Sequence, residues 1–320
     1  MTPSLPRSEA YVSPAWPSVE PRGVRPRGLR AFRAQVRTRL ARACALEERP
    51  PERFGFRFDT AARLLLVPGL LYRAYFRVEC HGIETLPPGP VLLAANHGSH
   101  VLSWDGAMIV SACLLEADPP RLVHGMVEHR LMELPVLGAV ARRIGAVDGN
   151  RAACLDLLRG GAAVLTFPEE VKALEKPFRE RYRLCPFGHG FVHVALATGA
   201  PVVPVAVIGA EEEAPLLASP RWLARLLRMP VAPITPTLLI PLPVKYRLYF
   251  GGPLRFDGPL TPEHVGRSVG LVQGALESLI GRGLAERRGN KTRAGGLAVP
   301  WSTRVARVAD KEEVACESRR

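Results

Sequence analysis

Two histidines and one aspartate lie close together in an otherwise apolar stretch, AANHGSHVLSWDGAMIV, which covers residues 94–110. They are His97, His100 and Asp105. A histidine held by an aspartate can act as a general base, because the carboxylate fixes the imidazole tautomer and stabilises the imidazolium that forms when a hydroxyl loses its proton. No serine or cysteine stands in a nucleophile-elbow context, in which a strand turns sharply into a helix. These residues therefore favour direct attack by a substrate hydroxyl on an activated acyl group, without a covalent enzyme intermediate.

The composition indicates a globular protein with an anionic partner. A hydrophobic fraction of 47% in 320 residues is enough to build a large core. The six cysteines include no C-x-x-C pair, so we expect reduced thiols and a cytoplasmic location. A net charge of +13 suits nucleic acid or an anionic membrane surface. Because no aromatic platform or known nucleic-acid module accompanies the arginines, we expect a membrane surface and no nucleic acid.

The N-terminal part has two segments that could meet such a membrane. Residues 1–21 are proline-rich and predicted to be disordered, and residues 22–78 are predicted to form basic amphipathic and interfacial helices. No apolar run approaches the roughly 20 residues that span a bilayer, so any attachment would be peripheral. Within 22–42, eight arginines accompany an apolar stripe, which could enter a membrane or fold against the protein's own core; the stripe is Leu29, Phe32, Val36 and Leu40. Residues 61–78 are predicted to form a helical pair kinked at Pro68.

From residue 79 to 284 the pattern predicts one α/β domain. Short apolar strands alternate with helices, which implies a mostly parallel sheet covered by helices on both faces. The expected strands are 90–96, 121–127, 162–167 and 201–209, with a further strand pair at 241–254. A final helix over 261–283 is expected to start at an N-cap, Thr261, and to bury Val265, Val269, Val272, Leu276 and Leu279. Residues 285–320 are predicted to be a disordered tail.

Four motifs occur in the order found in a known enzyme family. VECHGIETLPPGPVLLAANHGSH with DGAMI, then LPVLGAVARRIGAV, VLTFPEE and GAPVVPVAVIGAEE, resemble the glycerolipid acyltransferases typified by bacterial 1-acylglycerol-3-phosphate acyltransferase. The resemblance covers residues 60–255. It implies transfer of a fatty acyl group from acyl-CoA or acyl carrier protein to a glycerolipid hydroxyl, such as that of lysophosphatidic acid, by a His–Asp pair. It also implies that neither a metal nor another cofactor takes part.

The first motif leaves two interpretations of the base. The family pattern N-H-x-S-x-x-D places four residues between histidine and aspartate, a spacing that His100 and Asp105 satisfy. The Asn-His pair at the strand end instead matches at His97, with a loop three residues longer before Asp105. A longer loop between fixed ends costs little entropy, whereas a displaced base is poorly placed for chemistry. We favour His97 and Asp105 as the catalytic pair and keep His100 as the alternative base.

The remaining motifs imply a substrate site and one departure from the family. The resemblance assigns substrate-binding roles to Asn96, Ser99, Arg142, Arg143, Phe167, Pro168 and Glu169. The third motif is commonly F-P-E-G-T-R, but here Glu170 stands in the place of glycine and Val171 follows. The loss of the usual arginine leaves Lys172 or Lys176 to meet an acceptor phosphate. A neutral mono- or diacylglycerol acceptor, or a catalytically weakened member that only binds lipid, therefore stays open. His189 and His193 have helical spacing, but no carboxylate completes a metal site there.

Overall fold

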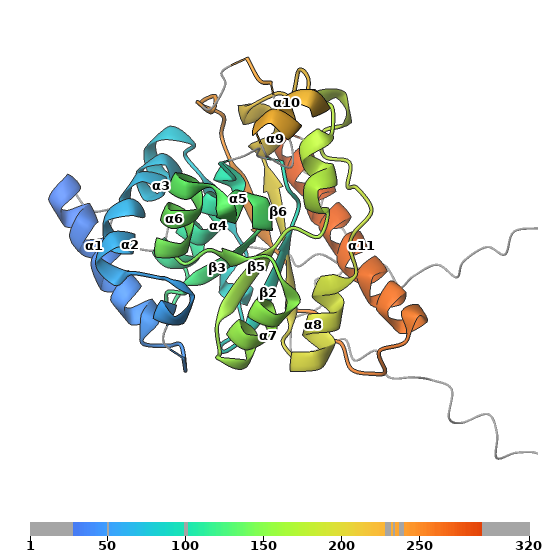
Figure 1. Ribbon diagram of the computed structural model, residues 1–320, viewed down its shortest axis with the longest axis horizontal. Coiled ribbons are helices and arrows are strands. Elements are labelled where there is room, and N and C mark those ends of the chain that lie inside the picture. The colour runs from blue at the N-terminus through green and yellow to red at the C-terminus, as the bar shows by residue number, and fades with distance from the viewer. Residues whose placement is uncertain are drawn as a thin grey trace, which may run out of the picture.

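The computed structural model describes residues 28–49, 51–98, 102–227, 232, 234–236 and 240–289. Its centre is a seven-stranded sheet in the order β1-β7-β6-β2-β5-β3-β4 (Figure 1). Neighbouring strands are parallel except β6 and β7, which are antiparallel. The strands are β1 (Glu79–His81), β2 (Val91–Ala95), β3 (Val123–Val127), β4 (Val147–Asp148), β5 (Ala163–Thr166), β6 (Val202–Ile208) and β7 (Arg247–Phe250). The predicted mostly parallel α/β sheet is confirmed.

Helices cover both faces of the sheet. They are α1 (Leu29–Cys44), α2 (Phe58–Leu64), α3 (Leu66–Leu70), α4 (Trp104–Leu115), α5 (His129–Glu133), α6 (Pro135–Arg143), α7 (Arg151–Arg159), α8 (Gly190–Thr198), α9 (Ala210–Glu213), α10 (Arg221–Leu227) and α11 (Pro262–Arg287). Successive residues of β2 point to opposite faces, with Leu93 in one apolar cluster and Leu92 in the other. The first cluster includes α1, α2 and α4, and the second includes α7, α8 and α11. Because β2 is buried on both sides, its sequence VLLAA is apolar throughout.

The arginine-rich segment forms α1, and its apolar stripe lies in the protein core. Phe32, Val36 and Leu40 are buried in the cluster that also holds α4, whereas Leu29 at the helix start is exposed. Of the two arrangements open for this stripe, the structure has the one in which it folds against the core. The other arrangement, in which the stripe enters a membrane, does not hold for Phe32, Val36 and Leu40, because these side chains already pack against the protein itself.

The helix after α1 breaks near its proline, as the sequence predicts. Pro68 has no N–H with which to bond the carbonyl of Leu64, and the chain passes from α2 to α3 at Leu65. A short π-helical turn, Leu71–Tyr75, follows. In the described ranges, none of the helices combines the length and apolar character that crossing a bilayer requires.

The last part of the chain differs from the sequence prediction in two places. The expected strand pair at 241–254 is one strand, β7, together with a single bridge between Leu254 and Val202. The final helix runs to Arg287, three residues beyond the expected end of the domain. Its start is as predicted, because the Thr261 side chain accepts a hydrogen bond from the His264 N–H. The five residues predicted for its buried face are all buried.

Candidate active site

The site begins where β2 ends, at Asn96. This side chain is fully buried and bonds the backbone of β6: its Nδ2 donates to the Val207 carbonyl at 3.0 Å, and its Oδ1 accepts from the Val207 N–H at 2.7 Å. Both ends of the amide are therefore occupied by β6. The substrate-binding role expected for Asn96 gives way to a structural one, because the amide ties the start of the next loop to the neighbouring strand.

His97 and Asp105 meet directly. The His97 Nδ1 lies 2.6 Å from the Asp105 Oδ2, and both residues are buried, with His97 8% exposed. Because Nδ1 is engaged by the carboxylate, it carries the proton in the neutral ring, and Nε2 is the nitrogen that can accept one. The pair lies at the carboxyl end of the parallel strands, which is where open α/β sheets bind ligands.

Asp105 is held by several donors besides the histidine. Its Oδ2 accepts from the Gly98 N–H at 2.9 Å, and its Oδ1 accepts from the Gly106 N–H at 2.7 Å and from the Ser103 hydroxyl at 3.0 Å. Asp105 lies in the first turn of α4, where the helix dipole also favours a negative charge. The carboxylate is therefore fixed from both sides of the loop and fixes the orientation of His97 in turn.

The third motif packs beneath the same histidine. The Phe167 ring stacks on the His97 ring with centroids 4.1 Å apart and planes 22° apart. Glu169 is fully buried, and its two oxygens accept from the His97 N–H at 3.2 Å and from the Cys185 N–H at 2.7 Å. Pro168, which lies between Phe167 and Glu169 in the sequence, is also buried, and its carbonyl accepts a hydrogen bond from the Gly188 N–H. Phe167 and Glu169 therefore position His97, whereas the resemblance had implied that they contact substrate.

A buried cluster of charged side chains lies next to His97. We call it the Lys176 cluster, and it consists of Glu169, Lys176 and Glu211. The Lys176 Nζ lies 3.0 Å from the Glu211 Oε1 and 3.9 Å from the Glu169 Oε2, and its side chain is 5% exposed. It also donates to the Arg183 carbonyl at 2.7 Å. Burial raises the pKa of the Glu211 carboxyl, and Lys176 opposes that rise. Lys176 is therefore committed to two carboxylates and does not serve an acceptor phosphate.

Glu211 is the member of this cluster that the sequence did not single out. It follows β6 in the fourth motif, and its side chain lies against Gly98, where an added Cβ would come within 2.4 Å of the Glu211 Cγ. The Gly98 position therefore requires glycine while Glu211 stays in place. An acidic residue directly after the fourth apolar strand, on the edge of the sheet that carries the histidine, was the available signal.

We expect the substitution Lys176→Met to destabilise the fold by about 3–5 kcal/mol, because it leaves two buried carboxylates without their cation. The matched control is Lys172→Met, since Lys172 is exposed in the same short segment and its loss should change stability by less than about 0.5 kcal/mol. Urea denaturation of both variants measures the difference. Equal unfolding free energies for the two would contradict a stabilising role for Lys176.

The arginines of the second motif make local contacts. Arg142 and Arg143 lie exposed at the end of α6. Arg142 donates to the Met132 carbonyl at 2.8 Å, and Arg143 donates to the Ala139 carbonyl at 3.1 Å. Within the part of the chain that the structure describes, their side-chain hydrogen bonds stay in α5 and α6. A role for them toward an acceptor phosphate stays a prediction.

Glu170 stands where the third motif commonly has glycine. Its φ angle is +56°, in the left-handed region that a glycine adopts without strain and another residue adopts at a cost of about 1–2 kcal/mol. The residue is exposed at the start of a short 3₁₀ helix, Glu170–Glu175. The backbone at this position therefore has a conformation that suits glycine, although the residue is glutamate.

Three other features of the sequence are a part of the loop after His97, a pattern around Ser268, and a pair of histidines near α8. Ser99 and His100 lie outside the described residues. A G-x-S-x-G pattern does occur at 266–270, but its Ser268 lies in the interior of α11 and is buried, so it is no nucleophile elbow. His189 is the N-cap residue of α8, and its carbonyl lies 2.9 Å from the His193 Nδ1, so these two histidines contact each other locally.

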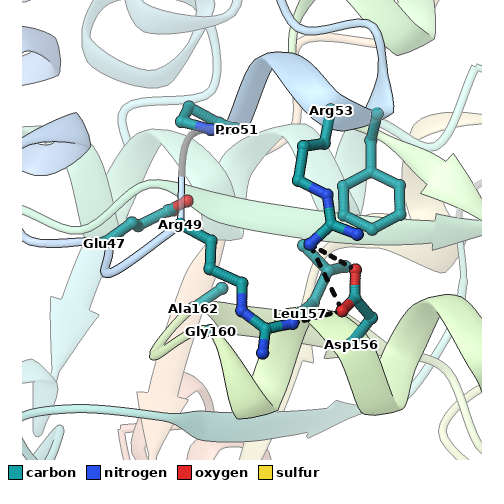
Figure 2. Close-up of a pocket in the computed structure, with 9 residues that line it drawn as sticks. Glu47, Arg49, Pro51, Arg53, Asp156, Leu157, Gly160 and Ala162 are labelled. Carbon is teal, nitrogen blue, oxygen red and sulfur yellow. Dashed lines mark hydrogen bonds and ion pairs between the residues drawn. The ribbon is translucent and has the colours of Figure 1, made fainter.

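A small pocket lies at the opposite end of the parallel strands from His97, where β5 begins. It is lined by residues near the amino end of β5, such as Gly160 and Ala162, together with the segment after α1. Figure 2 shows Arg49 and Arg53 directed at Asp156 of α7, to which both are paired. The pocket is therefore distant in topology from His97, which follows the carboxyl end of β2, and its two arginines hold the N-terminal segment to α7.

Part of this chain is similar to a known protein family. Residues 77–208 match the family described as Acyltransferase. An uncharacterized protein of Mycobacterium tuberculosis is 39% identical over 211 residues, which cover 62% of this chain and 59% of the relative. A human protein named "DGAT1/2-independent enzyme synthesizing storage lipids" is 27% identical over 209 residues, 63% of this chain and 60% of the relative. This chain thus spans about three fifths of the length of these curated relatives.

One solved structure is also similar. The crystal structure of the 1-acyl-sn-glycerophosphate (LPA) acyltransferase PlsC from Thermotoga maritima aligns with a TM-score of 0.45 and 17% identity, covering 78% of this chain and 97% of that chain. The family match spans β1, β2 with the His97 loop, α4, the third motif and β6. Residues 77–208, which include the His97 loop and the third motif, therefore match the Acyltransferase family.

Proposed function

We propose that this protein transfers a fatty acyl group from acyl-CoA or acyl carrier protein to the hydroxyl of a glycerolipid. The observation that carries the proposal is the bond of 2.6 Å between the His97 Nδ1 and the Asp105 Oδ2. The pair lies at the carboxyl ends of the parallel strands, within the residues that match the Acyltransferase family. The acyl donor and the lipid acceptor are the two substrates, and the chemistry needs no further cofactor. The reaction would take place at a membrane surface that the protein reaches from the cytoplasm.

His97 is the general base of the proposed reaction. Its Nε2 takes the proton of the acceptor hydroxyl while the hydroxyl oxygen attacks the thioester carbonyl carbon. Asp105 stabilises the imidazolium that forms. The carbon–sulfur bond then breaks, and the departing thiolate receives the proton from His97. Acyl ester and free thiol are the products, so atoms and charge balance without an acyl-enzyme.

The packing around His97 supports this role. Phe167 holds the plane of the ring, Glu169 holds its backbone, and Asp105 holds its Nδ1. A base that is already oriented loses little freedom when the two substrates arrive, which is the main advantage that a positioned group has over one in solution. This intact pair also argues against the alternative of a catalytically weakened lipid-binding member.

A neutral glyceride is the second candidate acceptor beside lysophosphatidic acid. Lys176 is committed to Glu169 and Glu211, and Glu170 adds a negative charge next to the third motif. Both observations weaken the case for a phosphate clamp and favour a mono- or diacylglycerol hydroxyl. The name of the human relative, which refers to storage lipids, is consistent with such an acceptor.

The test is an acyl-transfer assay on the purified full chain. Labelled acyl-CoA and acyl carrier protein are each supplied with lysophosphatidic acid, monoacylglycerol or diacylglycerol in detergent micelles, and the lipid products are separated. We expect a labelled ester with at least one acceptor and little donor hydrolysis when the acceptor is omitted. Lipid binding without turnover for every pair would instead support the weakened member, and the ratio of products identifies the acceptor class.

A further inference from the structure

The exposed apolar side chains are concentrated in one segment. Thirteen large hydrophobic residues are exposed in the described part of the chain, and five of them fall between residues 214 and 245. Four of these five are strongly exposed: Leu217 and Trp222 at 67%, and Leu226 and Ile240 at 71%. Trp222 and Leu226 are four residues apart on α10 and therefore share one face of the helix.

The same segment carries positive charge and no negative charge. Residues 214–245 include three arginines and one lysine, with no aspartate or glutamate, and the lysine, Lys245, is paired with Glu79 of β1. Arg225 is exposed directly beside Leu226. An apolar face beside an exposed arginine suits an anionic membrane, in which the apolar groups enter the acyl boundary and the guanidinium group meets phosphates. A second copy of the chain would instead bring the same positive charges face to face across a two-fold interface.

The position of the segment relative to the site follows from the strand directions. Residues 214–245 connect the carboxyl end of β6 to the start of β7, which runs antiparallel to β6. Because β6 and β2 are parallel neighbours, this is also the edge at which His97 follows β2. Figure 1 shows α9 and α10 together at this end of β6, while α7 and α8 lie at the opposite end.

We propose that the α10 surface, defined by Leu217, Trp222, Arg225 and Leu226, seats this protein on an anionic membrane with the His97 edge toward the lipid. The proposal rests on the proposed function, because a lipid acceptor would then pass from the bilayer to His97. It also assigns the insertion to a part of the chain other than α1. That helix has the arginines, but Phe32, Val36 and Leu40 of its stripe are buried.

The first experiment measures binding of the full chain to vesicles of phosphatidylglycerol and of phosphatidylcholine by co-sedimentation. The double substitution Trp222→Ser with Leu226→Ser should lower the partition coefficient by at least about tenfold, because both side chains would leave the acyl boundary. The control is Leu260→Ser. Leu260 is 52% exposed. It follows Leu254, which bridges Val202 at the amino end of β6, whereas α10 follows the carboxyl end of that strand.

Charge is tested by a second pair of variants. Arg225→Glu should weaken binding to phosphatidylglycerol vesicles much more than binding to phosphatidylcholine vesicles, and added salt should reduce the difference. Arg255→Glu is the control, because this substitution makes the same change in net charge. Arg255 is exposed near the amino end of β6. A loss of binding that is equal for Arg225 and Arg255 would overturn the proposal, since net charge alone would explain it.

Further readouts keep this proposal separate from the proposed reaction. Vesicle binding needs no turnover, and the double variant should retain wild-type activity toward acceptors dispersed in detergent and a wild-type circular dichroism melt. Unchanged vesicle binding by a folded double variant, or no binding by the wild type, would overturn the proposal. So would sedimentation velocity data in which the double substitution converts a dimer into a monomer, because the surface would then be a contact between copies.

Discussion

Replacing His97 by alanine is expected to lower the rate of acyl transfer by about 10³–10⁴-fold in a protein that still folds. The ring makes the bond of 2.6 Å to Asp105 and presents its Nε2 as the base, and alanine offers no group that can take the hydroxyl proton. The Phe167 ring loses a stacking partner, so a modest loss of stability is expected as well. The measurement is the initial rate with saturating acceptor, together with a thermal melt.

His100→Ala is the matched control for this prediction. Both histidines belong to the same loop, and His100 has the spacing to Asp105 that the family pattern would assign to the base. We expect the His100 variant to retain a substantial fraction of the wild-type rate. Full activity in His97→Ala combined with loss in His100→Ala would transfer the role of base to His100.

Asp105→Asn should be nearly as damaging, with a loss of about 10³–10⁴-fold in the rate of acyl transfer. An amide cannot stabilise the imidazolium as a carboxylate does. The amide NH₂ group also takes the place of one carboxylate oxygen. The N–H groups of Gly98 and Gly106 and the Ser103 hydroxyl donate to these oxygens, so at least one of the three hydrogen bonds is lost. Rate measurements across pH should show the loss at every pH at which the wild type is active.

The matched control is a second His–Asp pair on the surface. The Asp148 Oδ2 lies 2.9 Å from the Nδ1 of His129, and the side chain of His129 is 66% exposed. Asp148→Asn removes the same charge without touching the His97 loop, and we expect a rate close to that of the wild type. An unaffected rate in Asp105→Asn would count against the whole catalytic pair.

The sheet was predictable because its strands are buried on both faces. Largely apolar runs at β2, β5 and β6 stand out from the helices between them, and the structure has a strand in each. The run at β3 is also a strand, although it includes His124 and its last three residues are half-buried. By contrast β4 has only two residues, too few to produce a pattern of its own. The fate of the α1 stripe could not be decided from spacing, because helical periodicity shows that a face is apolar but not what covers it.

The site was predictable in its residues more than in their roles. The motifs led to His97, Phe167, Glu169 and Asp105, all of which lie together. Asn96 and Glu169 turned out to bond backbone groups, and Lys176 turned out to neutralise carboxylates. These contacts join residues 35 to 111 positions apart, and they depend on the direction of each side chain. Local sequence contains neither kind of information.

The pairing of β1 with β7 has a consequence for the order in which the chain folds. These strands lie side by side, yet Glu79 and its partner Arg247 are 168 positions apart, and an ion pair joins their side chains. During synthesis, α1, α2 and α4 can collapse onto β2 long before residue 247 leaves the ribosome. Until then β1 has no neighbour, and its backbone edge is open to pairing with another chain. Nascent chains stalled between residues 130 and 240 are therefore the species most exposed to misassembly and in greatest need of a chaperone.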